Sequence, residues 1–194
     1  VLSGGTWYEI AAEFAERVGE DVAARAAPPG GLPDAMPGET EDRYNARAAG
    51  DLKLHLLDKE LVLPPGAHSR IEFCDLLDMN KRVIHVKRRS RSSTLSHLFS
   101  QGVVSAELFL RDPRFRAALN THLSKAGLTE AAALVPKEAP TPREWEIVFA
   151  IIGPTSEDWP RSLPFFAQLN FKIAAERLMG PGYRVSLVQI PLGS

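Results

Sequence analysis

Cysteine is nearly absent from this 194-residue chain, which contains only Cys74. A single thiol cannot form an intramolecular disulfide, and no cysteine and histidine spacing of the zinc-finger type is present. We therefore expect neither a disulfide framework nor structural zinc. Such cysteine usage is typical of the reducing cytoplasm, which is where we expect the protein to act.

The chain also lacks an excess of charge and a long apolar run. Its 23 basic and 24 acidic residues give a formal net charge of -1, which excludes a uniformly basic nucleic-acid or membrane binder. No apolar run approaches the roughly 20 residues that span a bilayer, and the start VLSGGTWYEI lacks the layout of a signal peptide. We expect no membrane contact, and the missing initiator methionine indicates a piece of a longer polypeptide.

Common catalytic fingerprints are missing as well. The sequence contains no G-x-S-x-G elbow, no Walker phosphate loop and no G-x-G-x-x-G dinucleotide motif. These absences exclude the usual hydrolase and ATPase motifs, so that any chemistry must come from residues brought together by the fold.

What the chain does contain is the material for one core. Its 44% hydrophobic content predicts a single domain over 1–194. Stretches rich in proline at 28–38 and 136–143 predict loops or linkers. Apolar periodicity predicts, in order, a helix over 10–26, a helix over 39–50, strands over 52–58, 70–77 and 82–88, helices over 95–109 and 112–127, a strand over 145–152, a helix over 164–180 and a strand over 183–191. This order predicts an α+β (mixed α/β) fold with a central mixed sheet, a β-hairpin and flanking helices.

The predicted hairpin gathers side chains that carry chemistry. If its turn closes around 78–81, Leu77 opposes Arg82, and period-two alternation places Glu72, Cys74, His85 and Lys87 on one face. Asp75 then faces the opposite side, unless a bulge or a one-residue slip reverses the assignment. A simpler alternative is a cross-strand ion pair between Glu72 and Lys87 beside a half-buried histidine.

The residue types on this face favour metal-dependent phosphodiester cleavage. A carboxylate beside a histidine or a second carboxylate can hold Mg²⁺ or Mn²⁺, and a nearby lysine can stabilise the charge that develops on a phosphate. Glu72, His85 and Lys87 are therefore the candidate catalytic residues. The candidate metal ligands are Glu72, Asp58 and His85.

The order of a helix followed by three strands resembles the core of the restriction-endonuclease-like nucleases. That core has an acid on its second strand and an acid-x-Lys motif on its third. Here Glu72 matches the first acid, and His85, Val86 and Lys87 stand where the motif has its acid, variable residue and lysine. Histidine in place of the second acid lowers the affinity for a hard cation, so a derivative that binds without cleaving is an alternative.

Six basic side chains lie in the run from Lys81 to Arg91, along the third strand and its exit, immediately before a helix that Ser92 or Ser93 can cap. Cations and free backbone N–H groups in one place favour phosphate. A solvated basic edge balanced by the acidic segment 39–42 is the alternative. The expected phosphate or nucleic-acid contacts are Arg88, Arg89, Arg91, Ser92, Ser93, Ser96, His97 and Gln101. Upstream, the stretch Arg43, Tyr44 and Asn45 either contributes to a ligand pocket or anchors a helix face.

Longer stretches, among them IHVKR, LSHLFSQG and LPFFAQLNFKIAAERL, resemble an uncharacterised bacterial family described as sporadically distributed. It is a domain of unknown function encoded near restriction and other phage-defence genes. The resemblance runs along nearly the whole chain and implies that this region lies toward the carboxyl end of a larger protein. It implies a genomic context and no particular reaction.

Together these observations predict a nucleic-acid-processing domain of a phage-defence protein, acting by divalent-metal-dependent phosphodiester hydrolysis. The expected partners are DNA or RNA, together with the remainder of the longer chain or other defence proteins. Two alternatives stay open: a non-catalytic module that binds nucleic acid or a nucleotide, and a protein-interaction domain.

Overall fold

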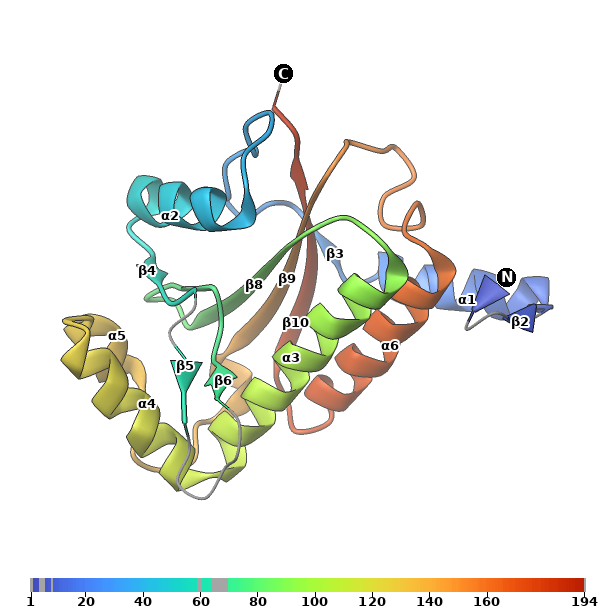
Figure 1. The fold of residues 1–194 in the computed structure, drawn as a ribbon. Coiled ribbons are helices and arrows are strands. Elements are labelled where there is room, and N and C mark those ends of the chain that lie inside the picture. Colours follow the sequence, from blue (N-terminus) through green and yellow to red (C-terminus); the bar gives the residue numbers. More distant parts are fainter. Residues whose placement is uncertain (1, 4–5, 8, 59–60, 64–69, 194) are drawn as a thin grey trace.

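A mixed six-stranded sheet with helices on both faces forms the centre of the computed structural model (Figure 1), as the predicted fold class requires. The structure describes residues 2–3, 6–7, 9–58, 61–63 and 70–193. The strand order is β3-β10-β9-β8-β7-β4. These strands are β3 (Ala26–Ala27), β4 (His55–Leu56), β7 (Leu76–Leu77), β8 (Arg82–Arg88), β9 (Glu146–Gly153) and β10 (Arg184–Pro191).

The middle of the sheet is parallel, and the outer strands on one side are antiparallel. β8, β9 and β10 run parallel to one another, whereas β7 is antiparallel to β8 and β4 is antiparallel to β7. β9 is buried along almost its whole length, because helices cover both of its faces. Such burial explains its unbroken apolar sequence, which is typical of a central parallel strand.

Helices cover the two faces of the sheet unequally (Figure 1). α3 (Ser92–Arg111) and α6 (Phe165–Met179) connect the parallel strands and pack side by side on one face, with α1 (Ala12–Ala23) against α6. α2 (Glu41–Leu52) lies on the other face. The helices predicted over 95–109 and 164–180 are therefore present, with ends that differ by a few residues.

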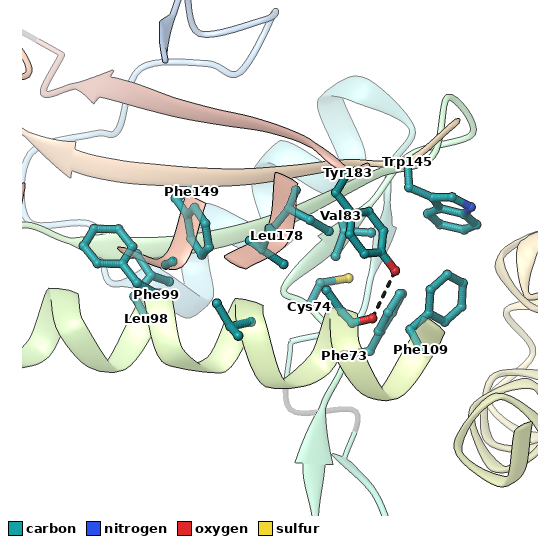
Figure 2. Close-up of a cluster of buried hydrophobic side chains, with 14 of the residues drawn as sticks. Phe73, Cys74, Val83, Leu98, Phe99, Phe109, Trp145, Phe149, Leu178 and Tyr183 are labelled. Carbon is teal, nitrogen blue, oxygen red and sulfur yellow. Dashed lines mark hydrogen bonds between the residues drawn. The ribbon is translucent and has the colours of Figure 1, made fainter. Parts of the chain in front are cut away.

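The main core lies between the sheet and α3 and α6. Figure 2 shows Phe73, Cys74 and Val83 in this core beside Tyr183, whose hydroxyl donates to the carbonyl of Ala106 at 3.0 Å. Cys74 is fully buried. The predicted hairpin register would have put its thiol on the same face as the candidate catalytic residues, whereas the structure places it among apolar side chains, and burial raises the pKa of that thiol.

The hairpin between β7 and β8 has a register one residue away from the predicted one. Leu77 pairs with Val83, and the backbone of Lys81 is left-handed, with φ of 63°. The Lys81 N–H donates to the Asp78 carbonyl, while the Asp78 carboxylate accepts from the N–H groups of Asn80 and Arg82. This is a three-residue loop with a bulge, and it shifts every residue before it by one position relative to β8.

The strand predicted over 70–77 is divided into two short pieces. β6 (Ile71–Glu72) pairs with β5 (Leu61–Val62) in a separate small sheet, and β7 alone joins the main sheet. Residues 73–75 separate them, and the side chains of Phe73 and Cys74 turn into the core. Burial of these two side chains interrupts the strand and bends the chain. The bend brings Glu72 beside α3.

The remaining elements lie outside the six-stranded sheet. α4 (Pro113–Lys125), within the helix predicted over 112–127, follows Asp112, whose carboxylate caps it. The other elements are α5 (Thr129–Leu134), η1 (Pro142–Glu144), β1 (Leu2–Ser3) and β2 (Thr6–Trp7). Within 28–38, Leu32 and Ala35 are buried under α2. No helix in the described part of the chain has the length and apolar character needed to cross a membrane.

Candidate functional site

The candidate site lies along the edge of β8 beyond the end of β7. β7 pairs with β8 over two residues, and carboxylates accept hydrogen bonds from the edge of β8 that follows. Val86 N donates to Asp75 Oδ2 at 2.7 Å, and Arg88 N donates to Glu41 Oε1 at 3.2 Å. A cavity of about 240 Å³ opens beside this edge, with walls from α2, β6, β8 and α3.

Three carboxylates converge in the cavity. One oxygen each of Asp58, Glu72 and Asp75 lie within 4.8 Å of one another, an arrangement of oxygen ligands suited to one hard divalent cation. Asp58 and Glu72 were predicted as ligands, whereas Asp75 was assigned to the opposite face unless the register slipped. The one-residue shift of the hairpin corrects that assignment. His85 lines the same cavity but does not belong to this group of three.

The environment of Asp75 disfavours its negative charge. Burial raises the pKa of Asp75 to about 7, and the nearby charges of Glu72 and Asp58 act in the same direction, against the Val86 N–H and Lys87. Among the three carboxylates, Asp75 is therefore partly protonated near neutral pH. A cation that binds them must displace that proton, so binding and deprotonation are coupled.

Two buried polar atoms in the walls of this cavity have no hydrogen-bond partner. Asn45 is 1% exposed and donates from Nδ2 to Asp58 Oδ2 at 3.4 Å, which leaves its Oδ1 unpaired. His85 is 4% exposed, and its Nε2 is unpaired. Since buried polar atoms are normally hydrogen-bonded, these two indicate that a polar ligand or solvent completes the cavity.

The imidazole of His85 is held neutral by its surroundings. Burial lowers the pKa of His85 to about 4, and the ring stacks on Phe149 with centroids 5.8 Å apart. A neutral ring can offer Nε2 as a hydrogen-bond donor or acceptor to a bound molecule, depending on the tautomer. It adds no positive charge to the cavity at neutral pH.

This burial predicts a pH-dependent contribution to stability. The unfolded chain binds more protons at His85 than the folded chain between pH 4 and 6.5, so unfolding becomes less favourable as pH rises through that window. Relative to a His85→Phe variant, the wild-type free energy of unfolding should increase by up to about 1.4 kcal/mol per pH unit there and then level off. Urea unfolding at several pH values measures this. If the difference between the free energies of unfolding of the wild type and His85→Phe stayed constant from pH 4 to 7, that result would contradict a buried neutral imidazole.

Lys87 extends from β8 into the cavity and forms an ion pair with Glu41 of α2. Its Nζ donates to Glu41 Oε2 at 2.7 Å, and both side chains are about one-third exposed. Glu41 thus holds Lys87 with one oxygen and the backbone of Arg88 with the other. Among the described residues, Lys87 is the only lysine or arginine in the cavity lining.

The arginines that follow β8 contact backbone carbonyls. Arg88 donates to the carbonyl of Glu39, and Arg89 donates to the carbonyl of Ser162. The Arg89 stem also packs against Gly153. Both guanidinium groups, predicted as phosphate contacts, thus tie loops to the end of the sheet, while Arg91 is exposed.

The start of α3 differs from the predicted cap. Arg91 occupies the N-cap position and no side-chain cap is formed, so neither Ser92 nor Ser93 has the predicted capping role. Ser96 Oγ donates to the Ser92 carbonyl and accepts from Asn170 of α6, each at 2.7 Å. Ser96 therefore faces α6 and not the cavity.

The next residues of α3 do face the cavity. His97 and Gln101, one helical turn apart, line it together with Leu98. Of the predicted phosphate contacts, these two lie beside Glu72, His85 and Lys87. The structure thus joins the hairpin residues to one face of α3, and the arrangement can hold a cation next to a lysine and two polar side chains.

From α2, the sequence singled out Asn45 as a possible pocket residue, and Glu41 only as part of the acidic segment 39–42. Glu41 and Asn45 lie four residues apart and so share a helix face, which points to the cavity. Tyr44 has the anchoring role that was the alternative for this stretch, because it is fully buried and its hydroxyl donates to the Pro33 carbonyl at 3.0 Å. The four-residue spacing of polar residues on α2 was the available signal.

Comparisons with known proteins place the chain in a family. No curated protein and no solved structure matches it. One family model matches residues 1–191, which is nearly the full length. The chain therefore belongs to the family of unknown function DUF6119.

Proposed function

We propose that this domain hydrolyses phosphodiester bonds of nucleic acid with the help of a divalent cation. The observation that carries the proposal is the group of three carboxylates, Asp58, Glu72 and Asp75, in a cavity that also contains Lys87 and unpaired buried polar atoms. Mg²⁺ and Mn²⁺ prefer such oxygen ligands. A bound cation would polarise the phosphate and lower the pKa of a bound water.

Each side chain has a distinct role in this proposal. The three carboxylates hold the cation, and Lys87 stabilises the negative charge that develops on the phosphate oxygens. To do so, the Lys87 ammonium group exchanges its contact with Glu41 for a contact with substrate. Neutral His85 orients a water or a phosphate oxygen through Nε2, while His97 and Gln101 contact the substrate at the mouth of the cavity.

The resemblance to restriction-endonuclease-like nucleases supports the proposal in modified form. The resemblance is imperfect because His85 stands where those nucleases have an acid, two residues before the lysine. Asp75 supplies a further carboxylate from the neighbouring segment, so the cation does not depend on His85. The resemblance to a family encoded near phage-defence genes supports a role in defence, and a lone buried thiol suits the cytoplasm.

Cleavage assays with labelled nucleic acid test the proposal. We expect Mn²⁺- or Mg²⁺-dependent cleavage of DNA or RNA that EDTA abolishes. Lys87→Met should lower the rate at least about 100-fold, since it removes a charge that acts in the transition state. Lys125→Met is the matched control, because Lys125 is exposed at the end of α4, and its rate should equal that of the wild type.

Two results would replace this proposal. A full cleavage rate in Lys87→Met would remove Lys87 from the reaction. Salt-sensitive binding of nucleic acid without cleavage, unaffected by EDTA, would instead support the non-catalytic binding module.

A further inference from the structure

A second cavity adjoins the group of three carboxylates at Glu72. It has a volume of about 380 Å³ and lies between Arg70 and β6 on one side and α3 on the other. Glu72, His97 and Gln101 line both cavities. Whatever occupies the second cavity therefore lies directly next to a ligand bound at the carboxylates.

The lining of this second cavity differs from that of the first. Ile71 and Val104 supply apolar surface, Arg70 is exposed, and Ser100 and Gln101 bring a hydroxyl and an amide. His97 is exposed and stands at the boundary. Charged and polar side chains line the first cavity, whereas the second adds apolar walls, a hydroxyl and an amide to the charged groups of Arg70 and Glu72.

We propose that the second cavity binds the base of the nucleotide whose phosphate lies at the carboxylates, an inference that rests on the proposed function. A nucleobase is flat and apolar on its faces and carries donors and acceptors on its edge. Apolar side chains, a guanidinium plane and an imidazole favour the faces. Ser100 and Gln101 offer the edge both donors and acceptors.

This assignment predicts the form of the substrate. A base that enters the cavity leaves its stack, and unstacking costs least when the strand is unpaired. The domain should therefore act on single-stranded nucleic acid or on ends and should disfavour an intact duplex. Contacts of this kind tolerate different sequences, since every base offers a similar face.

A thiol introduced into the cavity tests the assignment. Val104 is 45% exposed in its wall, and Ile173 is 53% exposed on the neighbouring helix α6, outside the cavity lining. Cys74 is fully buried, so Val104→Cys and Ile173→Cys each add one accessible thiol. The reaction of each variant with a maleimide dye is followed with Ca²⁺ present, with and without a single-stranded oligodeoxynucleotide.

We expect the oligonucleotide at about ten times its dissociation constant to slow labelling of Val104→Cys about tenfold. Labelling of Ile173→Cys should not change. The matching duplex, and an oligonucleotide of the same length without bases, should protect Val104→Cys less. Unchanged labelling of Val104→Cys, or equal protection by the oligonucleotide without bases, would overturn the assignment.

The outcome separates this inference from the proposed function. Protection that depends on bases, in a protein that cleaves nothing, would keep the base site and reject hydrolysis. Metal-dependent cleavage without protection at position 104 would keep hydrolysis and reject the base site.

Discussion

Asp75→Asn is expected to weaken Mn²⁺ binding by at least about 100-fold and, at pH 8 without metal, to raise the melting temperature by about 5–10 °C. Both effects have one cause, the negative charge of a buried carboxylate beside Glu72 and Asp58. This negative charge binds the cation when the cation is present. Without the cation, it is an uncompensated buried charge that destabilises the fold. The amide oxygen of asparagine can still accept the hydrogen bond from the Val86 N–H.

The sign of the stability effect follows from the pKa of Asp75, which is about 7 in the folded chain against 3.8 for an ordinary aspartate. The folded chain therefore binds more protons here than the unfolded chain between these values. Stability that is present below pH 4 is lost as pH rises through 7. The advantage of Asp75→Asn should be near zero at pH 4 and about 2–4 kcal/mol at pH 8.

Mn²⁺ binding has its own pH dependence. Because the cation replaces a proton, wild-type Mn²⁺ affinity should fall up to about tenfold per pH unit below pH 7. Isothermal titration calorimetry in two buffers of different ionisation enthalpy measures affinity and released protons together. Asp158→Asn, which changes an exposed aspartate outside the cavity, is the control and should match the wild type. Normal Mn²⁺ affinity in Asp75→Asn would place any cation elsewhere.

Gly102→Ala is expected to destabilise the fold by about 2–3 kcal/mol, although alanine is normally the better helix residue. A Cβ atom at this position of α3 would lie 2.5 Å from Cε1 and 2.7 Å from Cζ of Phe149. That ring cannot move aside, because the edge-on rings of Phe99 and Phe171 hold it at 5.2 and 6.0 Å between centroids. The helix must instead move away from the sheet.

Gly50→Ala is the matched control for this prediction. Gly50 lies within α2, and a Cβ atom there would meet nothing within 4 Å. Its replacement should therefore stabilise the chain by about 0.5–1 kcal/mol through helix propensity alone. Thermal unfolding of the two variants measures both effects. If Gly102→Ala stabilised the chain as Gly50→Ala does, the contact between α3 and Phe149 would not be tight.

Long elements were predictable from the sequence because their apolar residues repeat with one period. Strand 82–88 coincides with β8, and the helix predicted over 164–180 differs from α6 by a residue at each end. Short elements such as β3 and α5 escaped because a few residues carry no measurable period. The strand over 70–77 was predicted as one piece because the bend at Phe73 and Cys74 is enforced by burial, a tertiary effect.

The site was predictable in its location and not in its full membership. Glu72, His85 and Lys87 line one cavity as the hairpin pattern predicted, but the bend after β6, and not pairing with β8, brings Glu72 there. Asp75 was assigned to the wrong face because the left-handed position of the turn is occupied by Lys81, where glycine or asparagine would have marked a three-residue loop. The contact of Lys87 with Glu41 joins residues 46 apart in sequence, which no local pattern reports.

The carboxylates along β8 also bear on how the domain stays separate from other copies of itself. The unpaired edge of a sheet is a template to which a further strand can add, and proteins that leave one open risk association through it. Here Asp75 and Glu41 accept from the N–H groups of Val86 and Arg88. An incoming strand would have to displace both carboxylates. The acidic groups that we assign to a cation thus also protect the open edge of the sheet against aggregation.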